Sequence, residues 1–99
     1  MTPQDRQSLL TWILKLSYKE GDFALVSGKK SSFYMDMKPS AFHPQSVRLI
    51  AKGMVDEAEA YAREKGQAFH GVGGMTLGAD PLATAASLEA DSRGIFWPA

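Results

Sequence analysis

Residues Gly71–Pro81, with the sequence GVGGMTLGADP, decide how the chain is interpreted. They predict the end of a strand, a glycine-rich loop and the start of a helix that Asp80 caps and in which Pro81 takes the first position. Glycine allows positive φ and lets a ligand approach the backbone without meeting a Cβ atom. Successive N–H groups before a helix favour an anion such as phosphate or pyrophosphate. The spacing matches neither GxGxxG nor GxxxxGK[ST], so a tight turn without a ligand is an equal alternative.

The sequence before this loop predicts a helix, a hairpin and a longer helix. Residues 2–18 have an amphipathic pattern that starts at Thr2, a good capping residue. Residues 23–37 predict a hairpin, because a short apolar run and an alternating run flank a polar turn. Residues 43–65 repeat apolar side chains every three or four positions, and Gly66 is placed to end that helix in a left-handed conformation.

The remaining segments predict two short strands and the rest of the helix that follows the glycine loop. Ala68–Val72 is apolar and too short for a helix, so we expect a buried strand there. Residues 82–89 continue the helix after the glycine loop. Ile95–Trp97 is too apolar for a frayed tail and predicts the start of another strand. The expected architecture is α/β, with residues 1–99 as one partial domain truncated at its C-terminus.

Composition narrows the function classes. The 99 residues allow one small domain, and the 11 basic and 11 acidic residues cancel, which argues against a nucleic-acid coat or a polybasic membrane binder. No cysteine is present, so neither a disulfide nor a thiolate metal site can form within the chain. Neither a signal peptide nor an apolar run of membrane-spanning length is found, and we expect a cytoplasmic protein.

Other candidate site residues are individually ambiguous. The hairpin tip Ser27–Ser31 contains two lysines that could hold a phosphate, although a solvated turn is the commoner outcome. Tyr34 could lie flat against a planar ligand or pack in the core, and Asp36 could bind a sugar hydroxyl or a metal, or be solvated. His43 is expected to cap a helix or lie at the surface, and His70 to be a packed or edge residue. No catalytic triad, metal cluster or carboxylate pair can be assembled from the sequence.

Two long motifs carry a resemblance to a known family. The run GDFALVSGKKSSFYMDMK (residues 21–38), followed by a helix and then GVGGMTLGADPLATA (residues 71–85), resembles orotate phosphoribosyltransferase. The resemblance extends from about Leu14 to Ala99. It implies a type I phosphoribosyltransferase fold, in which a mainly parallel sheet has helices on both faces and the N-terminal helix and hairpin form part of a small hood.

The resemblance also implies an activity. Members transfer phosphoribosyl from phosphoribosyl pyrophosphate to orotate, with Mg²⁺, and release orotidine monophosphate and pyrophosphate in pyrimidine (UMP) biosynthesis. They act as homodimers. The residues that correspond to substrate-binding positions are Lys29 and Lys30 near the substrate phosphates, Tyr34 and Met35 along the orotate pocket, and Thr76, Leu77, Gly78 and Ala79 in the pyrophosphate loop. The chain departs from some members at Val26, Ser32 and Lys38, where lysine, proline and arginine occur.

The family continues beyond the position of Ala99 with a mobile catalytic loop and a loop for the ribose 5-phosphate. We therefore expect the catalytic residues to lie downstream, and the 99-residue chain to be an inactive fragment of low solubility or molten character. Two alternatives stay open. The chain is a non-catalytic anion-binding or regulatory module, or it is a helper subunit that dimerises with a full-length copy through its first helix and the helix at 43–65.

Overall fold

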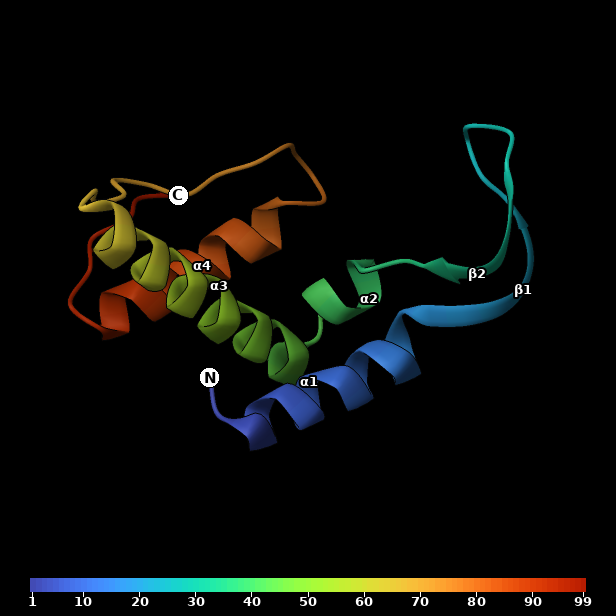
Figure 1. Ribbon diagram of the computed structural model, residues 1–99, viewed down its shortest axis with the longest axis horizontal. Coiled ribbons are helices and arrows are strands. Elements are labelled where there is room, and N and C mark those ends of the chain that lie inside the picture. The colour runs from blue at the N-terminus through green and yellow to red at the C-terminus, as the bar shows by residue number, and fades with distance from the viewer.

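The computed structural model describes all of residues 1–99 and contains four helices and one two-stranded sheet (Figure 1). The elements, in chain order, are α1 (Pro3–Leu16), β1 (Tyr18–Ala24), β2 (Lys30–Met35), α2 (Lys38–Ala41), α3 (Pro44–Lys65) and α4 (Asp80–Ser92). None of the helices combines the length and the apolar character needed to cross a membrane.

Helix α1 begins, and α3 begins and ends, where the predicted capping residues place them, whereas α1 ends at Leu16, two residues earlier than predicted, because β1 starts at Tyr18. The Thr2 hydroxyl accepts the Asp5 N–H at 3.0 Å, and the Asp5 carboxylate accepts the Thr2 N–H at 3.4 Å, which completes a capping box. At α3, Nδ1 of His43 accepts the Ser46 N–H at 3.4 Å. Gly66 ends α3 with φ of 64°, in the left-handed region that favours glycine. The predicted caps of both helices are confirmed.

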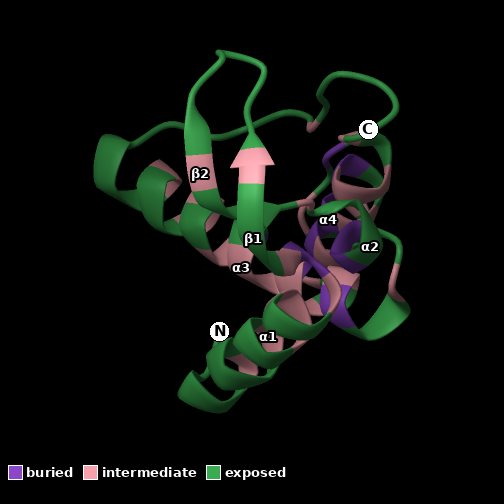
Figure 2. Cartoon of the chain, turned by 90° about the vertical axis from the view of Figure 1, so that its right-hand side faces the viewer, coloured by how far each residue is buried: buried purple, intermediate pink, exposed green.

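The hydrophobic core lies between α3 and α4 and is small. It is formed by Val55, Ala86, Ala90 and Trp97. Only 10 of the 99 residues are buried, and they lie mainly in α3, α4 and α2; Figure 2 shows the buried segments where these helices meet. The radius of gyration is 15.3 Å, whereas a compact domain of this length has about 13 Å. The chain is therefore extended, and one helical layer provides most of its packing.

The sheet is an antiparallel hairpin with one irregularity. Tyr18 pairs with Met35 and Phe23 with Ser31, and the register shifts between Glu20 and Phe23. Figure 1 shows the hairpin extending away from the helices. Because no second layer covers it, both of its faces remain accessible to water.

The hairpin differs from its sequence-based prediction in three ways. Strand β1 begins at Tyr18, five residues before the predicted start at residue 23. Strand β1 ends at Ala24, so Val26 lies in the turn, with an exposed fraction of 110%. The apolar face expected from the alternation of Phe33 and Met35 is not buried, since these side chains are 49% and 45% exposed. Alternation indicates which residues share a face, but burial requires an element to pack against that face.

The α/β class is confirmed, but the two strands expected at Ala68–Val72 and Ile95–Trp97 are not formed. The two segments nevertheless lie side by side. The Val72 N–H donates to the Pro98 carbonyl at 3.1 Å, and the Trp97 indole N–H donates to the Phe69 carbonyl at 3.1 Å. A strand requires a repeated ladder of backbone bonds, and here only one backbone bond joins the segments.

Candidate phosphate-binding loop

Residues 73–79 form the loop that leads into α4, and this loop presents a row of free backbone donors. The Ala79 N–H donates to the Met75 carbonyl at 3.0 Å, and the Asp80 N–H donates to the Leu77 carbonyl at 3.2 Å. The N–H groups of residues 73–78 donate no hydrogen bond within the chain, and all six residues are exposed. Six solvated N–H groups next to a helix N-terminus can donate to a bound anion without the loss of any hydrogen bond within the protein.

The glycines of the loop are needed for a different reason from the one predicted. Gly73, Gly74 and Gly78 do not have positive φ, so the loop does not use the freedom in φ that glycine allows. At Gly74 the requirement is steric, because a Cβ atom there would lie 2.5 Å from the Cβ of Ala79. At Gly73 and Gly78 a Cβ would meet no atom within 4 Å. Only Gly74 is therefore required by the folded loop itself.

Asp80 does not cap α4 as predicted. The N-cap residue is Ala79, which makes no side-chain cap bond, and Asp80 is the first residue of the helix. Its carboxylate accepts a hydrogen bond from the Thr76 hydroxyl across the loop. A carboxylate in the first turn stabilises the helix dipole but repels a bare anion, so an anion at this loop is favoured when it carries a cation. The Thr76–Leu77 peptide bond is cis.

The hairpin holds the other four predicted site residues. Lys29 lies in the turn, where its carbonyl accepts the Leu25 N–H at 2.8 Å, and Lys30 is the first residue of β2. Tyr34 lies against Phe23, with ring centroids 5.7 Å apart, and is 45% exposed. Its neighbour Met35 is equally exposed.

The structure leaves the two groups of predicted site residues apart. No hydrogen bond or ion pair connects the hairpin with the loop at 73–79, and Figure 1 shows the hairpin tip well away from that loop. Of the other candidates, His43 caps α3 as expected, and Asp36 accepts the Lys38 N–H at 3.1 Å. His70 is exposed and makes no hydrogen bond.

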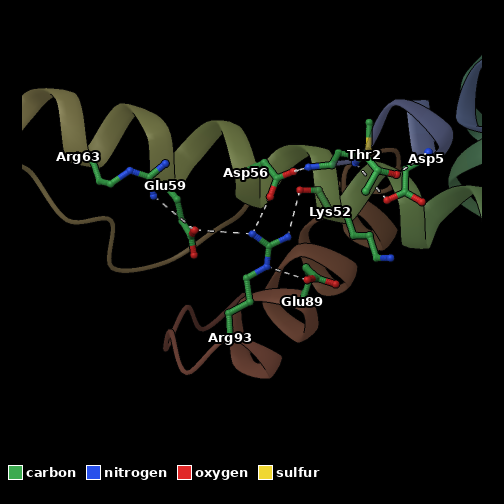
Figure 3. Close-up of polar contacts among 9 residues, drawn as sticks. Thr2, Asp5, Lys52, Asp56, Glu59, Arg63, Glu89 and Arg93 are labelled. Atoms are coloured by element: carbon green, nitrogen blue, oxygen red, sulfur yellow. Dashed lines mark hydrogen bonds and ion pairs between the residues drawn. The ribbon is translucent and has the colours of Figure 1, made fainter. Parts of the chain in front are cut away.

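The sequence-based reasoning missed a charged cluster that holds α4 against α3 (Figure 3). Arg93, next to the end of α4, donates from Nε to Glu89 at 2.8 Å and from Nη1 to Asp56 of α3 at 2.7 Å. Glu59 lies 3.7 Å from the same Nη1. The spacing of Glu89 and Arg93 was a visible signal for the pair within α4. The pairing with α3 spans 37 residues and has no local signal.

The cluster shifts two ionisation equilibria. Two hydrogen bonds, the larger effect from the Met1 amine and the smaller from Arg93, hold the pKa of the Asp56 carboxyl below its ordinary value. Hydrogen bonds to Glu89 and then to Asp56 raise the pKa of the Arg93 guanidinium. Both shifts mean that the folded chain favours the charged forms, so the cluster stabilises the contact between α3 and α4. It thereby fixes the helix that follows the loop.

Comparison with curated proteins identifies relatives. No protein-family model matches the chain. The chain is 42% identical over 87 residues to the orotate phosphoribosyltransferase of Pyrococcus furiosus. The matched region covers 87% of the chain and 46% of that protein. It is 37% identical over 79 residues to the orotate phosphoribosyltransferase of Rhodopirellula baltica, covering 80% of the chain and 41% of that protein.

Solved structures agree with these sequence matches. Orotate phosphoribosyltransferase of Mycobacterium tuberculosis H37Rv, in complex with inorganic phosphate, superposes with a TM-score of 0.67 at 32% identity, over 85% of the chain and 46% of that structure. Leishmania donovani UMP synthase gives a TM-score of 0.66 at 28% identity, over 85% of the chain and 18% of that structure. In sequence and in fold, the chain is therefore a relative of the orotate phosphoribosyltransferases, and it spans about half or less of the length of the curated relatives it matches.

Proposed function

We propose that the chain serves an orotate phosphoribosyltransferase, in which phosphoribosyl passes from phosphoribosyl pyrophosphate to orotate. Orotidine monophosphate forms, and pyrophosphate leaves. The observation that carries the proposal is the row of six free N–H groups in front of α4, in a chain whose relatives bear this name. We further propose that the complete protein acts as a homodimer in the cytoplasm.

The loop at Thr76, Leu77, Gly78 and Ala79 is the proposed pyrophosphate site. In the transfer, negative charge builds up on the departing pyrophosphate as its bond to the ribose breaks. Backbone N–H groups that donate no bond within the protein are available to stabilise such charge at a helix N-terminus. The dipole of α4 acts in the same direction, because its positive end faces the loop.

The proposed Mg²⁺ fits this site only as a companion of the substrate. No group of three acidic or histidine side chains in the chain is close enough to hold an ion alone. Magnesium is usually held by one or two carboxylates together with substrate phosphates. Asp80 lies at the edge of the loop and is the carboxylate that would take this role. The ion would neutralise part of the charge of the diphosphate.

The hairpin is the proposed orotate side of the pocket. Tyr34 and Met35 are exposed and could cover a planar ring, while Lys29 and Lys30 bring positive charge toward the substrate phosphates. Since hairpin and loop are not in contact, we infer that the pocket closes only when further structure or substrate brings them together. We therefore propose that the 99 residues bind pyrophosphate but do not complete the reaction alone.

The test is a titration of the ¹⁵N-labelled chain with inorganic pyrophosphate, with and without Mg²⁺, followed through backbone amide shifts. The expected result is a saturable shift confined to residues 73–80. The Kd should be lower with Mg²⁺, because Asp80 helps to hold the ion. An identical titration with sodium sulfate is the control. Sulfate has no diphosphate group with which to chelate Mg²⁺, so it should bind more weakly. Absence of a saturable shift, or shifts confined to the hairpin, would refute the assignment of the loop.

A further inference from the structure

The two ends of the hairpin meet at one residue. Ser17 caps the C-terminus of α1, and its N–H donates to the Ile13 carbonyl at 2.9 Å. Its carbonyl accepts the N–H of Asp36 at 3.0 Å, directly after β2. The base of the hairpin is thus closed at the end of α1.

Three fully buried hydroxyl groups connect this base to the helices. Oγ of Ser17 and Oγ of Ser40 in α2 lie 2.5 Å apart. Ser46 in α3 donates from Oγ to the Ser40 carbonyl at 2.5 Å. All three residues have no exposed surface. The result is a continuous chain of hydrogen bonds from α1 through α2 to α3.

Nothing else restrains the hairpin by polar contacts. No hydrogen bond or ion pair from residues 18–35 reaches a helix. The aromatic side chains of the hairpin pack in pairs on one another, Tyr18 with Phe33 and Phe23 with Tyr34, and Phe33 and Tyr34 are nearly half exposed. A hydrogen bond between buried hydroxyls is directional and is stronger than the same bond in water. The orientation of the hairpin therefore depends on its base.

We propose that Ser17, Ser40 and Ser46 form a latch that sets the orientation of the hairpin relative to the glycine loop. They are positioning residues, because they touch neither the loop nor the substrate-facing tip of the hairpin. Their role in catalysis rests on the proposed function, in which tip and loop belong to one pocket. Their role in orientation does not, and it can be measured without any substrate.

The experiment measures the separation of hairpin and loop directly. Because the chain has no cysteine, Val26→Cys in the hairpin turn and Met75→Cys in the loop give two unique labelling sites. Both positions are highly exposed, at 110% and 87%. Pulsed electron–electron double resonance between nitroxide spin labels at these two sites yields a distribution of label-to-label distances. We expect a narrow distribution with the serines intact, and a broader one with a shifted mean after Ser40→Ala.

Three variants and one structural readout decide the outcome. Ser8→Ala removes an exposed hydroxyl of α1 that makes no hydrogen bond and should leave the distribution unchanged. Ser46→Ala should broaden it, whereas Ser46→Thr, which keeps the hydroxyl, should restore the narrow form. Far-UV circular dichroism reports the helices in each case. An unchanged distribution with intact helices would overturn the proposal, as would loss of the helices, since the serines would then hold the fold as a whole.

Discussion

Substitution of Gly74 tests whether the shape of the loop creates the anion site. The new Cβ of Gly74→Ala would lie 2.5 Å from the Cβ of Ala79, the residue before α4. Carbon atoms in contact lie about 3.5–4.0 Å apart, so the loop must move by about 1 Å or more. Overpacking of this kind costs about 1–3 kcal/mol. In a domain of this size, about 1 kcal/mol lowers Tm by roughly 4–8 °C.

The effect on binding should exceed the effect on stability. A displacement of about 1 Å would lengthen hydrogen bonds to the anion from about 2.9 Å to beyond the useful range, and each bond to a charged group contributes about 1.5–3 kcal/mol. Loss of a single bond then weakens pyrophosphate binding by about tenfold or more. Titration calorimetry well below Tm gives the affinity, and calorimetric melting gives the stability.

The matched control lies one residue earlier. Gly73→Ala adds the same methyl group to the same loop, but that Cβ meets no atom within 4 Å. Its Tm should not fall, because Gly→Ala without a clash restricts the unfolded chain and stabilises by about 0.4–1 kcal/mol, and its affinity should fall less than that of Gly74→Ala. The steric reasoning would be refuted by a Gly74→Ala chain that binds pyrophosphate as well as the Gly73→Ala chain does.

Three further outcomes are expected. Asp56→Asn should destabilise the chain by about 1 kcal/mol at neutral pH, because Asp56 pairs with Arg93 and the Met1 amine at a partly exposed site. The folded-state pKa of Asp56 is lowered from 3.8, so this stability is present above about pH 4 and is lost as pH falls through the folded pKa. Urea unfolding at several pH values should therefore show that the free energy of unfolding falls less steeply in acid for Asp56→Asn than for the exposed control Glu57→Gln. Trp97→Ala should cost about 3 kcal/mol or more and largely abolish helical circular dichroism, since Trp97 closes the small core; retained cooperative melting would contradict this. Finally, the 99-residue chain with orotate, phosphoribosyl pyrophosphate and Mg²⁺ should show no loss of orotate absorbance, and measurable turnover would disprove its proposed inactivity.

Most predictions that depended on local chemistry were confirmed, although the predicted cap at Asp80 was wrong, because α4 begins one residue earlier and Ala79 takes the N-cap position. The capping box at Thr2 and Asp5, the cap at His43 and the left-handed Gly66 each involve residues within a few positions of one another. Their energetics is determined by a short stretch of chain, which is why the sequence alone reveals it.

The predictions that depended on distant partners were less successful. Ala68–Val72 has the composition of a strand, but a strand also needs neighbours with which to form a ladder, and the chain offers it one backbone bond, to Pro98. The pairing of Arg93 with Asp56 likewise depends on how two helices cross. For the candidate site, the sequence located the loop before α4, but the steric role of Gly74 depends on the position of Ala79 and could not be read from composition.

The closed base of the hairpin also has a consequence for how such proteins diversify. Because the Ser17 carbonyl and the Asp36 N–H are 3.0 Å apart, residues 18–35 leave and re-enter the helical body at nearly the same point. An insertion with adjoining ends can be lengthened, shortened or exchanged with little disturbance to its host. The hairpin can therefore vary in length and sequence, and with it the proposed orotate-facing surface, while the proposed pyrophosphate loop at residues 73–79 stays unchanged.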